Sequence, residues 1–460
     1  MDEPILRAAL ADLDRNLLER DGPVRLLLLA ALAGEHVLLI GPPGTAKSEL
    51  ARRLHAAFVD APYFERLLTR FSVPEELFGP LSLTALEQDR YERLTGGFLP
   101  TAQIAFLDEV FKANSAILNA LLTLLNEREF DNGAGRVRVP LVSVVGATNE
   151  VPHDESLQAF HDRFLLRVPV QPVGDAHFAA LLALPAQAVH GRPQLRAADL
   201  QPLRERARQV VLPPDVTALL VQARAWCVQQ AVTVSDRRWR KLVGLLQVQA
   251  ASRGAAQVER WDLWLLPYAL GARPDQVQAL VPWCDERVGQ AVPLDLQWLA
   301  RAARAFEKQL EIETTAQPDD AADDGAGKLA LARAISGEAA GHDNAMVRIV
   351  SERARRRYSP RHVQARVAQV QEIRQRCAVA LQSAREAAHA ALDGARDHLW
   401  LPPDLLARIG AVHQANVALA QSLHDDLQRL ARDFGELPVD THAQGPEPAP
   451  VALGAVEQPK

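Results

Sequence analysis

The stretch of the chain best suited to chemistry is a loop of small residues that ends in a lysine and a serine. Its residues are Gly41, Pro42, Pro43, Gly44, Thr45, Ala46, Lys47 and Ser48. Small residues let backbone N–H groups point at phosphate oxygens, and a helix that starts here adds a favourable dipole. We therefore expect the loop to bind ATP, with Lys47 facing the β- and γ-phosphates and Ser48 as a ligand to Mg²⁺. Ala46 stands where such loops usually have glycine, and its methyl group fits there if the backbone stays in a right-handed conformation.

Polar residues follow two later apolar runs. Asp108 and Glu109 come directly after Ile104–Leu107, and Asn149 comes shortly after Leu141–Ala147. Parallel strands end at the ligand-binding edge of a sheet, so these side chains should meet the phosphate loop. We expect Asp108 to hold Mg²⁺ through water, Glu109 to polarise the attacking water, and Asn149 to orient that water or contact the γ-phosphate. The alternatives are a solvated strand end and an ordinary turn asparagine.

Two arginines lie further along the chain. Arg163 follows a helix-length segment, Glu155–His161, which should place it away from its own phosphate loop. If subunits form a ring, Arg163 can reach a neighbour's γ-phosphate, where charge develops during hydrolysis; the alternative is a surface ion pair with Asp162. Arg237, within Ser235–Trp239, starts a helix and is expected to contact phosphate from above, the alternative being an exposed arginine at a capped helix start.

The elements that position these residues alternate between strands and helices in residues 1–173. Apolar runs predict strands at His36–Ile40, Ile104–Leu107, Leu141–Ala147 and Phe164–Val170. This alternation predicts an α/β fold, a parallel sheet with helices on both faces. Residues 174–285 lack strand signals and predict a helical lid domain.

The remaining residues predict a discontinuous helical bundle over 286–435. Apolar residues recur at spacings of three and four in helices near 294–313, 361–396 and 403–434. An acidic linker, 314–340, interrupts the bundle. Residues 436–460 contain five prolines and little periodicity, which predicts a disordered tail.

Composition narrows the class of protein. The chain has 460 residues, 48% of them hydrophobic, and a net charge of −6, which gives no global sign of a nucleic-acid binder. Its three cysteines are isolated, so we expect neither disulfides nor a zinc site, and a cytoplasmic location. The N-terminus is acidic where a signal peptide would be basic. The longest apolar stretch, Leu26–Ala33, is too short to span a membrane.

The order of these motifs resembles the AAA+ superfamily of ATPases. The blocks Phe71–Pro80, Tyr91–Pro100 and Ala120–Phe130 are similar to its MoxR branch. Further similarity to the RavA-like (regulatory ATPase variant) subfamily lies in Thr69–Ser72, Ser235–Trp239 and Trp400–Asp404. That subfamily carries a small β domain within its bundle, and the corresponding segment here, Thr314–Ala340, is too short for one.

The resemblance implies a chaperone-like ATP hydrolase that assembles into a homohexameric ring. It would remodel or mature protein clients, including metal or cofactor insertion, together with a partner that has a von Willebrand factor A domain. It also implies that Phe71–Pro100 includes an insert that projects toward the ring pore, the alternative being a surface excursion without function.

Two other functions are compatible with these motifs. One is a nucleic-acid-dependent AAA+ motor or loader, but the expected hairpin tip, Glu87–Arg93, has three acidic and two basic residues, and a DNA-tracking tip should be net basic. The other is a nucleotide-binding scaffold without turnover, which the presence of both Asp108 and Glu109 disfavours. The basic run Arg353–Arg357 is either a solvated helix face or a contact for nucleic acid or an acidic partner.

Overall fold

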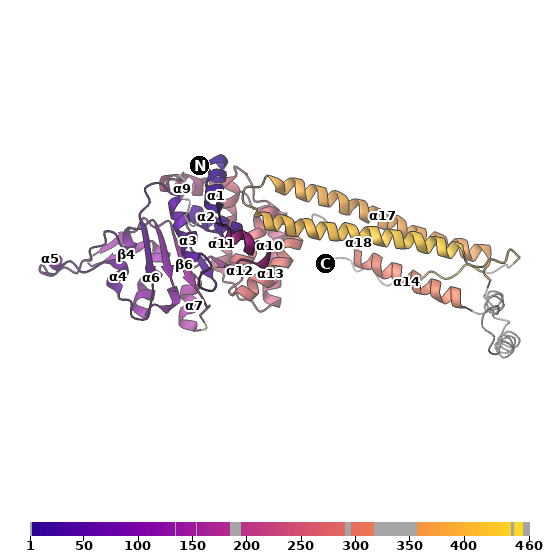
Figure 1. Cartoon of the computed structure of the whole chain (residues 1–460), viewed down its shortest axis with the longest axis horizontal. Helices are drawn as coiled ribbons and strands as arrows, with labels where there is room; N and C mark the ends of the chain where they lie inside the picture. The colour runs from indigo at the N-terminus through magenta and orange to yellow at the C-terminus, as the bar shows by residue number, and fades with distance from the viewer. Residues whose placement is uncertain are drawn as a thin grey trace. The chain divides into compact units, whose positions relative to one another are not determined.

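The computed structural model describes most of the chain. The described residues are 2–133, 135–152, 154–184, 195–289, 296–316, 357–442 and 446–453. The chain forms two compact units (Figure 1): residues 1–289 with 394–409 make unit 1, and residues 290–393 with 410–460 make unit 2. Among the described residues, no helix is both long and apolar enough to cross a bilayer.

A five-stranded parallel sheet forms the centre of unit 1. Its strands lie in the order β2 (Tyr63–Leu67), β3 (Ile104–Asp108), β6 (Ser143–Thr148), β1 (Val37–Ile40) and β7 (Leu166–Pro169). The four predicted strands are confirmed. Strand β2 was not predicted, because it lies at the edge of the sheet and only Phe64 is buried among its five residues.

Helices cover both faces of this sheet, as predicted. On strand β1, Val37 and Leu39 belong to one hydrophobic cluster, whereas Leu38 and Ile40 belong to another. Helices α1 (Glu3–Asp14), α2 (Asp21–Ala33) and α3 (Lys47–Ala56) contribute to the first cluster, and α6 (Ser115–Glu127) with part of α7 (Glu155–His161) contributes to the second. A strand buried on both faces must be apolar throughout, which is why these runs do not alternate.

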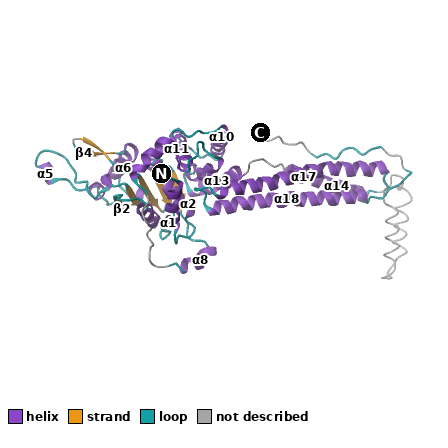
Figure 2. Ribbon diagram, turned by 90° about the horizontal axis from the view of Figure 1, so that it is seen from above, coloured by secondary structure: helices purple, strands orange, loops and turns teal. Residues whose placement is uncertain are grey.

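The segment between β2 and β3 is a long excursion from the sheet. It contains α4 (Pro74–Phe78) and α5 (Leu83–Leu86), and α5 lies at its far end in both ribbon views (Figures 1 and 2). Gly79 is required where the excursion narrows, because its φ is +91° and a Cβ would lie 2.0 Å from the carbonyl oxygen of Leu94. A second projection is the antiparallel hairpin of β4 (Glu129–Asn132) and β5 (Gly135–Arg138).

The predicted lid segment is helical in its described residues. Its helices are α8 (Asp175–Leu182), α9 (Leu200–Ala207), α10 (Pro214–Gln229), α11 (Asp236–Ser252), α12 (Leu266–Leu270) and α13 (Pro274–Gly289). Helix α11 begins as predicted, because the Ser235 hydroxyl accepts a hydrogen bond from the backbone N–H of Arg238.

The predicted domain boundaries differ from the structure at the segment that joins the last two helices of the chain. We placed residues 394–409 in the bundle, but they belong to unit 1. Trp400 explains the difference: its side chain is fully buried, and its indole N–H donates to Ser252 Oγ at 2.8 Å. The aliphatic side chains of Leu401, Leu405 and Ile409 join the same core.

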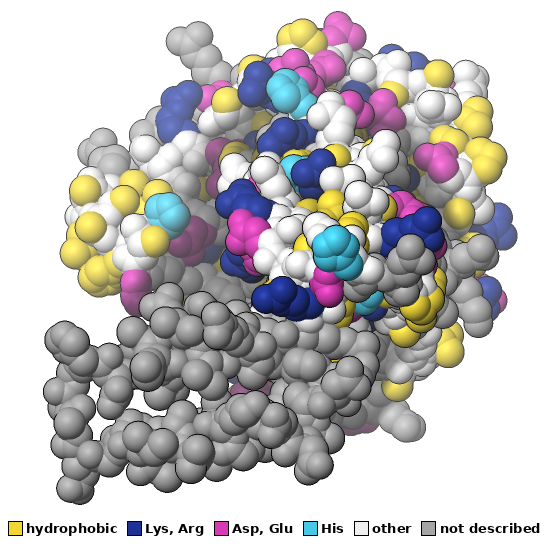
Figure 3. Space-filling model, turned by 90° about the vertical axis from the view of Figure 1, so that its right-hand side faces the viewer, with side chains coloured by type: hydrophobic (Ala, Val, Ile, Leu, Met, Phe, Trp, Pro, Cys, Tyr) yellow, Lys and Arg dark blue, Asp and Glu magenta, His cyan; other side chains and the backbone are white. Residues whose placement is uncertain are grey.

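Unit 2 contains the predicted bundle helices. They are α14 (Leu296–Thr315), α17 (Pro360–Arg396) and α18 (Pro403–Gly435), of which the last two continue into the 394–409 segment. Most of the predicted acidic linker and of the basic run Arg353–Arg357 lies outside the described residues. Acidic and basic side chains are interspersed in the described part of the face in Figure 3, in keeping with the small net charge.

The prediction of a disordered tail was wrong for its described residues. Leu437 is buried, and Val451 and Leu453 pack on the core of unit 2. The guanidinium of Arg366 donates to the carbonyl oxygen of Ala449 at 2.8 Å. Prolines removed the helical periodicity that we looked for, but an extended chain can still pack on a bundle through alternate side chains.

Candidate functional site

The phosphate loop joins the end of β1 to the start of α3. Its apex, Pro42–Gly44, is exposed, whereas Lys47 is 8% exposed. The backbone N–H of Gly41 donates to Thr148 O at 3.1 Å, so the loop begins on the neighbouring strand β6. Only glycine fits at position 41, because a Cβ there would lie 2.0 Å from the carbonyl oxygen of Val170.

Ala46 does not have the right-handed conformation that would accommodate its methyl group without strain. Its φ is +68° and its ψ is 24°, in the left-handed region. The residue is the N-cap of α3, and its carbonyl accepts the helix's first hydrogen bond, from Leu50 N. The loop must therefore reverse direction at position 46 whichever residue is there. An L-residue in this conformation costs about 1 kcal/mol relative to glycine, so Ala46 is a point of backbone strain.

Hydrogen bonds connect the functional side chains at the ends of three neighbouring strands. Lys47 Nζ donates to Gly41 O at 2.5 Å, to Pro42 O at 2.9 Å and to Asn149 Oδ1 at 3.1 Å. Asn149 Nδ2 in turn donates to Glu109 Oε1 at 2.6 Å. Because β1, β6 and β3 are adjacent and parallel, Lys47, Asn149 and Glu109 form a continuous row at one edge. The structure thus brings these predicted residues together.

Glu109 is held in an unusual backbone conformation. Its φ is +52°, in the left-handed region that non-glycine residues rarely adopt. Its backbone N–H donates to Asp108 Oδ1 at 3.0 Å, and Lys112 Nζ lies 3.3 Å from its other carboxylate oxygen, Oε2. We did not single out Lys112 from the sequence, although its position three residues after the acidic pair was a usable signal.

The donor and acceptor groups at this edge fit a magnesium nucleotide. Burial lowers the pKa of Lys47, and the carboxylates of Asp108 and Glu109 oppose that effect. A pocket of about 370 Å³ opens beside Glu109 and Asn149. The loop N–H groups and the Lys47 ammonium suit phosphate oxygens. The Ser48 hydroxyl and the Asp108 carboxylate are the hard oxygen ligands that Mg²⁺ prefers.

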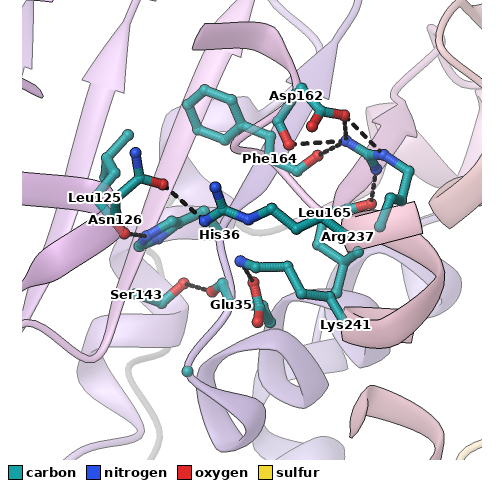
Figure 4. Close-up of polar contacts among 12 residues, drawn as sticks. Glu35, His36, Leu125, Asn126, Ser143, Asp162, Phe164, Leu165, Arg237 and Lys241 are labelled. Atoms are coloured by element: carbon teal, nitrogen blue, oxygen red, sulfur yellow. Dashed lines mark hydrogen bonds and ion pairs between the residues drawn. The ribbon is translucent and has the colours of Figure 1, made fainter. Parts of the chain in front are cut away.

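Arg237 lies at the opposite edge of the sheet from the phosphate loop, where the strands begin. Its Nη2 donates to Asn126 Oδ1 at 2.9 Å, in the last turn of α6 (Figure 4). The preceding residue, Leu125, pairs through its carbonyl with His36, just before β1 begins. Strand β1 spans about 13 Å, so Arg237 and the phosphate loop are at its two ends. The expectation that Arg237 contacts phosphate stays a prediction, and its position beside the strand starts places it away from the phosphate loop of its own chain.

Arg163 lies near Arg237. Burial lowers the pKa of Arg163, and the charge of Arg237 lowers it further. The described ion pairs of Asp162 are with Arg238 at 3.0 Å and Arg167 at 3.5 Å, so the alternative pairing of Asp162 with Arg163 does not appear among them. As predicted, Arg163 precedes β7 at the edge away from its own phosphate loop.

Comparisons with known proteins agree with this geometry. Residues 4–205 match a family model described as the MoxR domain in the MoxR-vWA-beta-propeller ternary systems, and residues 215–283 match an AAA lid domain. Two uncharacterized proteins of Methanocaldococcus jannaschii are 41% and 38% identical, over 55% and 58% of this chain and 67% and 71% of their own. Chaperone MoxR1 of Mycobacterium tuberculosis is 30% identical over 36% of this chain and 44% of its own.

The chain belongs to the MoxR family of AAA+ ATPases. Similarity to the RavA-like subfamily stays a prediction. In this MoxR-family chain the lid match begins after α9 and ends within α13, so it includes α11 with Arg237 and Arg238.

One further buried residue at the phosphate edge was not predicted. The Arg20 guanidinium donates to Thr45 O at 3.4 Å, within the phosphate loop, and to Gln171 O at 2.6 Å, just beyond β7. Arg20 is 5% exposed, and burial lowers its pKa. It connects the loop of this MoxR-family ATPase to the segment that leads into the lid. A lone arginine between two helical patterns gave no sequence signal for that role.

Proposed function

We propose that this chain hydrolyses Mg-ATP within a homohexameric ring and uses turnover to remodel or mature protein clients. The observation that supports it best is the division of the catalytic groups between two edges of one sheet. Lys47, Asn149 and Glu109 form a hydrogen-bonded row at one edge. Arg163 and Arg237 lie together at the other. A neighbouring subunit would supply what each edge lacks.

At the phosphate edge, each residue has a separate role. The loop N–H groups and Lys47 bind the phosphates. Ser48 and Asp108 would hold Mg²⁺, which neutralises developing charge on the phosphate oxygens. Glu109 polarises the attacking water with its carboxylate. Asn149 bridges Lys47 and Glu109, so it aligns the water-polarising group with the phosphate-binding group.

At the opposite edge, Arg163 and Arg237 would act on the nucleotide of the adjacent subunit. Their role is electrostatic, because a cation supplied in trans stabilises charge on the transferring phosphoryl group. Two guanidinium groups near each other favour an anion between them, which supports this assignment.

A mixing experiment tests the shared site. Arg163→Ala keeps its own phosphate loop, and Glu109→Gln keeps its own Arg163, so each alone should be nearly inactive. Mixed rings contain interfaces that pair an intact loop with an intact arginine, and ATP hydrolysis should partly return. Co-assembled rings that stay as inactive as both parents would refute action in trans.

The excursion between β2 and β3 is our candidate for client contact. Large apolar side chains on it are exposed: Leu83 by 75%, Leu86 by 50%, Tyr91 by 52% and Leu94 by 56%. Two of its arginines are paired, Arg90 with Glu92 and Arg93 with Glu75, and Arg70 lies over the ring of Phe71. A surface that is apolar and pairs most of its arginines suits polypeptide better than a nucleic-acid backbone.

We also propose a partner with a von Willebrand factor A domain and a cytoplasmic location. The description of the matching family model supports the partner, and the three buried free thiols suit a reducing compartment. Glu109→Gln, which should hold ATP without turnover, is the form to use as bait. ATP-dependent capture of a protein with such a domain would support this proposal, and capture of nucleic acid alone would refute it.

A further inference from the structure

Arg238 is a buried arginine that the proposed mechanism does not yet use. It follows Arg237 on helix α11 and is 3% exposed. Its Nη1 donates to Leu165 O at 2.7 Å and to Ala269 O at 3.0 Å. Its Nη2 donates to the carbonyl oxygens of Asp162 and Phe164, both at 3.0 Å.

The Asp162 carboxylate completes this set of acceptors. Its Oδ1 accepts from Arg238 Nε at 3.1 Å and from Nη2 at 3.0 Å. In Figure 4, dashed lines join one guanidinium group to Asp162 and to the backbone carbonyl oxygens of Phe164 and Leu165, and the hydrogen bonds identify that group as Arg238. An arginine has five N–H donors in a rigid plane, and each nitrogen of this one is engaged by the surrounding protein. Arg238 therefore has no donor left for a nucleotide, in contrast to Arg237.

Apart from Ala269 O, these acceptors belong to residues on both sides of Arg163. Asp162 precedes it, and Phe164 and Leu165 follow it, so the backbone that carries Arg163 is held from α11. Arg237 is the adjacent residue of that helix. A single planar group thus connects the backbone on both sides of Arg163 to the helix that carries Arg237.

We propose that Arg238 is a positioning residue that holds Arg163 and Arg237 as one unit for action on the neighbouring subunit's nucleotide. This inference rests on the proposed action in trans. A helix could be anchored here by apolar packing alone, with lower desolvation cost than a buried cation. The hydrogen bonds instead converge on the carbonyls that flank Arg163, which is what positioning that residue requires.

The test compares two mixtures of chains that differ only in which chain carries Arg238→Lys. Arg238→Lys keeps a cation opposite Asp162 but loses the planar fork that reaches several carbonyls. In one mixture it is added to the Glu109→Gln chain, which donates the arginines. In the other it is added to the Arg163→Ala chain, which donates the phosphate loop. The overall composition of the rings is the same in both mixtures.

We expect recovered hydrolysis to fall only when the donor of the arginines carries Arg238→Lys. A displacement of about 1 Å can cost roughly 100-fold in rate, and the loss should appear in kcat with KM for ATP little changed. Arg240→Gln, an exposed arginine on the same helix, is the matched control and should change neither mixture.

Other outcomes overturn the proposal. Equal loss in both mixtures would show a purely structural role in every subunit, and no loss in either would show no role. If the parent mixture itself recovers no activity, action in trans fails first. If Arg238→Lys chains do not enter rings, Asp162→Asn tests the same connection, because it removes the carboxylate that accepts two of the hydrogen bonds.

Discussion

The two edges of the parallel sheet are built in different ways. At the phosphate edge, the functional side chains come from residues at or just beyond the ends of adjacent strands, and they hydrogen-bond to one another. At the opposite edge, Arg163 comes from a loop and Arg237 from a lid helix. Arg238, next to Arg237 on that helix, hydrogen-bonds to the backbone on both sides of Arg163. The first edge is positioned by the sheet, and the second by packing between two parts of unit 1.

The edges also differ in charge. Lys47 and Lys112 lie with the carboxylates of Asp108 and Glu109, so cations and anions balance. At the other edge, Arg167 and Arg238 both pair with the carboxylate of Asp162, and the charge of Arg237 acts on Arg163. This clustering of cations is in keeping with the proposed action on an anion bound by a neighbouring subunit.

The largest expected effect tests the edge that carries Arg163 and Arg237, called the cationic edge below. Arg163→Ala should lower kcat for ATP hydrolysis by about 10³–10⁵-fold, because the cation acts on charge that develops in the transition state. Nucleotide affinity, measured by calorimetry, should stay within a few-fold of wild type. Loss of affinity with unchanged kcat would assign Arg163 to ground-state binding.

The next effect tests the phosphate edge. Glu109→Gln should lower turnover by about 10²–10⁴-fold, since an amide cannot polarise water as a carboxylate does. ATP binding should persist, because Lys47 and the loop remain intact. Lys47→Ala is the contrasting variant and should abolish tight binding. A Glu109→Gln protein that hydrolyses ATP at the wild-type rate would show that another residue orients the water.

Acid should weaken the cationic edge. Burial, helped by the charges of Arg167 and Arg238, lowers the pKa of His161 from 6.5 to about 3. Below pH 6.5 His161 is protonated in the unfolded chain but stays neutral in the folded chain, so the free energy of unfolding falls as pH falls toward 3. One such histidine costs about 2 kcal/mol by pH 5.

Urea unfolding at pH 7.5 and pH 5 measures this loss. The decrease in unfolding free energy between the two pH values should be smaller in His161→Asn than in wild type, because position 161 no longer titrates. Comparison of the two proteins removes the contribution of every other group that titrates in this range. An equal decrease in both proteins would contradict the assignment.

The smallest expected effect concerns strain in the phosphate loop. Ala46→Gly should raise the unfolding free energy by up to about 1 kcal/mol, because glycine adopts the left-handed conformation freely, although its greater entropy in the unfolded chain offsets part of the gain. Differential scanning calorimetry should show a small rise in melting temperature. A clear fall would mean that the methyl group makes contacts that outweigh the strain.

Local pattern predicted one edge of the sheet far better than the other. The four apolar runs were long enough to identify β1, β3, β6 and β7, and the polar residues after them necessarily meet when the strands are parallel and adjacent. The placement of Arg237 depends instead on how α11 packs against the loop before β7. No periodicity in the sequence reports that packing, because Arg238 and its acceptors are far apart along the chain.

Backbone conformation was the other quantity that the sequence did not reveal. Ala46 and Glu109 both have positive φ angles although neither is glycine, asparagine or aspartate. The surrounding structure imposes these conformations through the turn into α3 and the end of β3. Residue preferences describe unstrained backbone, so they do not predict positions where the surrounding structure forces a residue into a rare conformation.

The buried loop around Trp400 has a practical consequence for dissecting the molecule. Since residues 394–409 complete the core of unit 1, cleavage after residue 289 would leave an ATPase fragment without its last layer of apolar side chains. That fragment would expose the Ser252 hydroxyl and the aliphatic surface around it to water. The ATPase core is contiguous in space but not in the amino-acid sequence. A soluble minimal version needs residues 394–409, joined by a linker or added as a separate peptide.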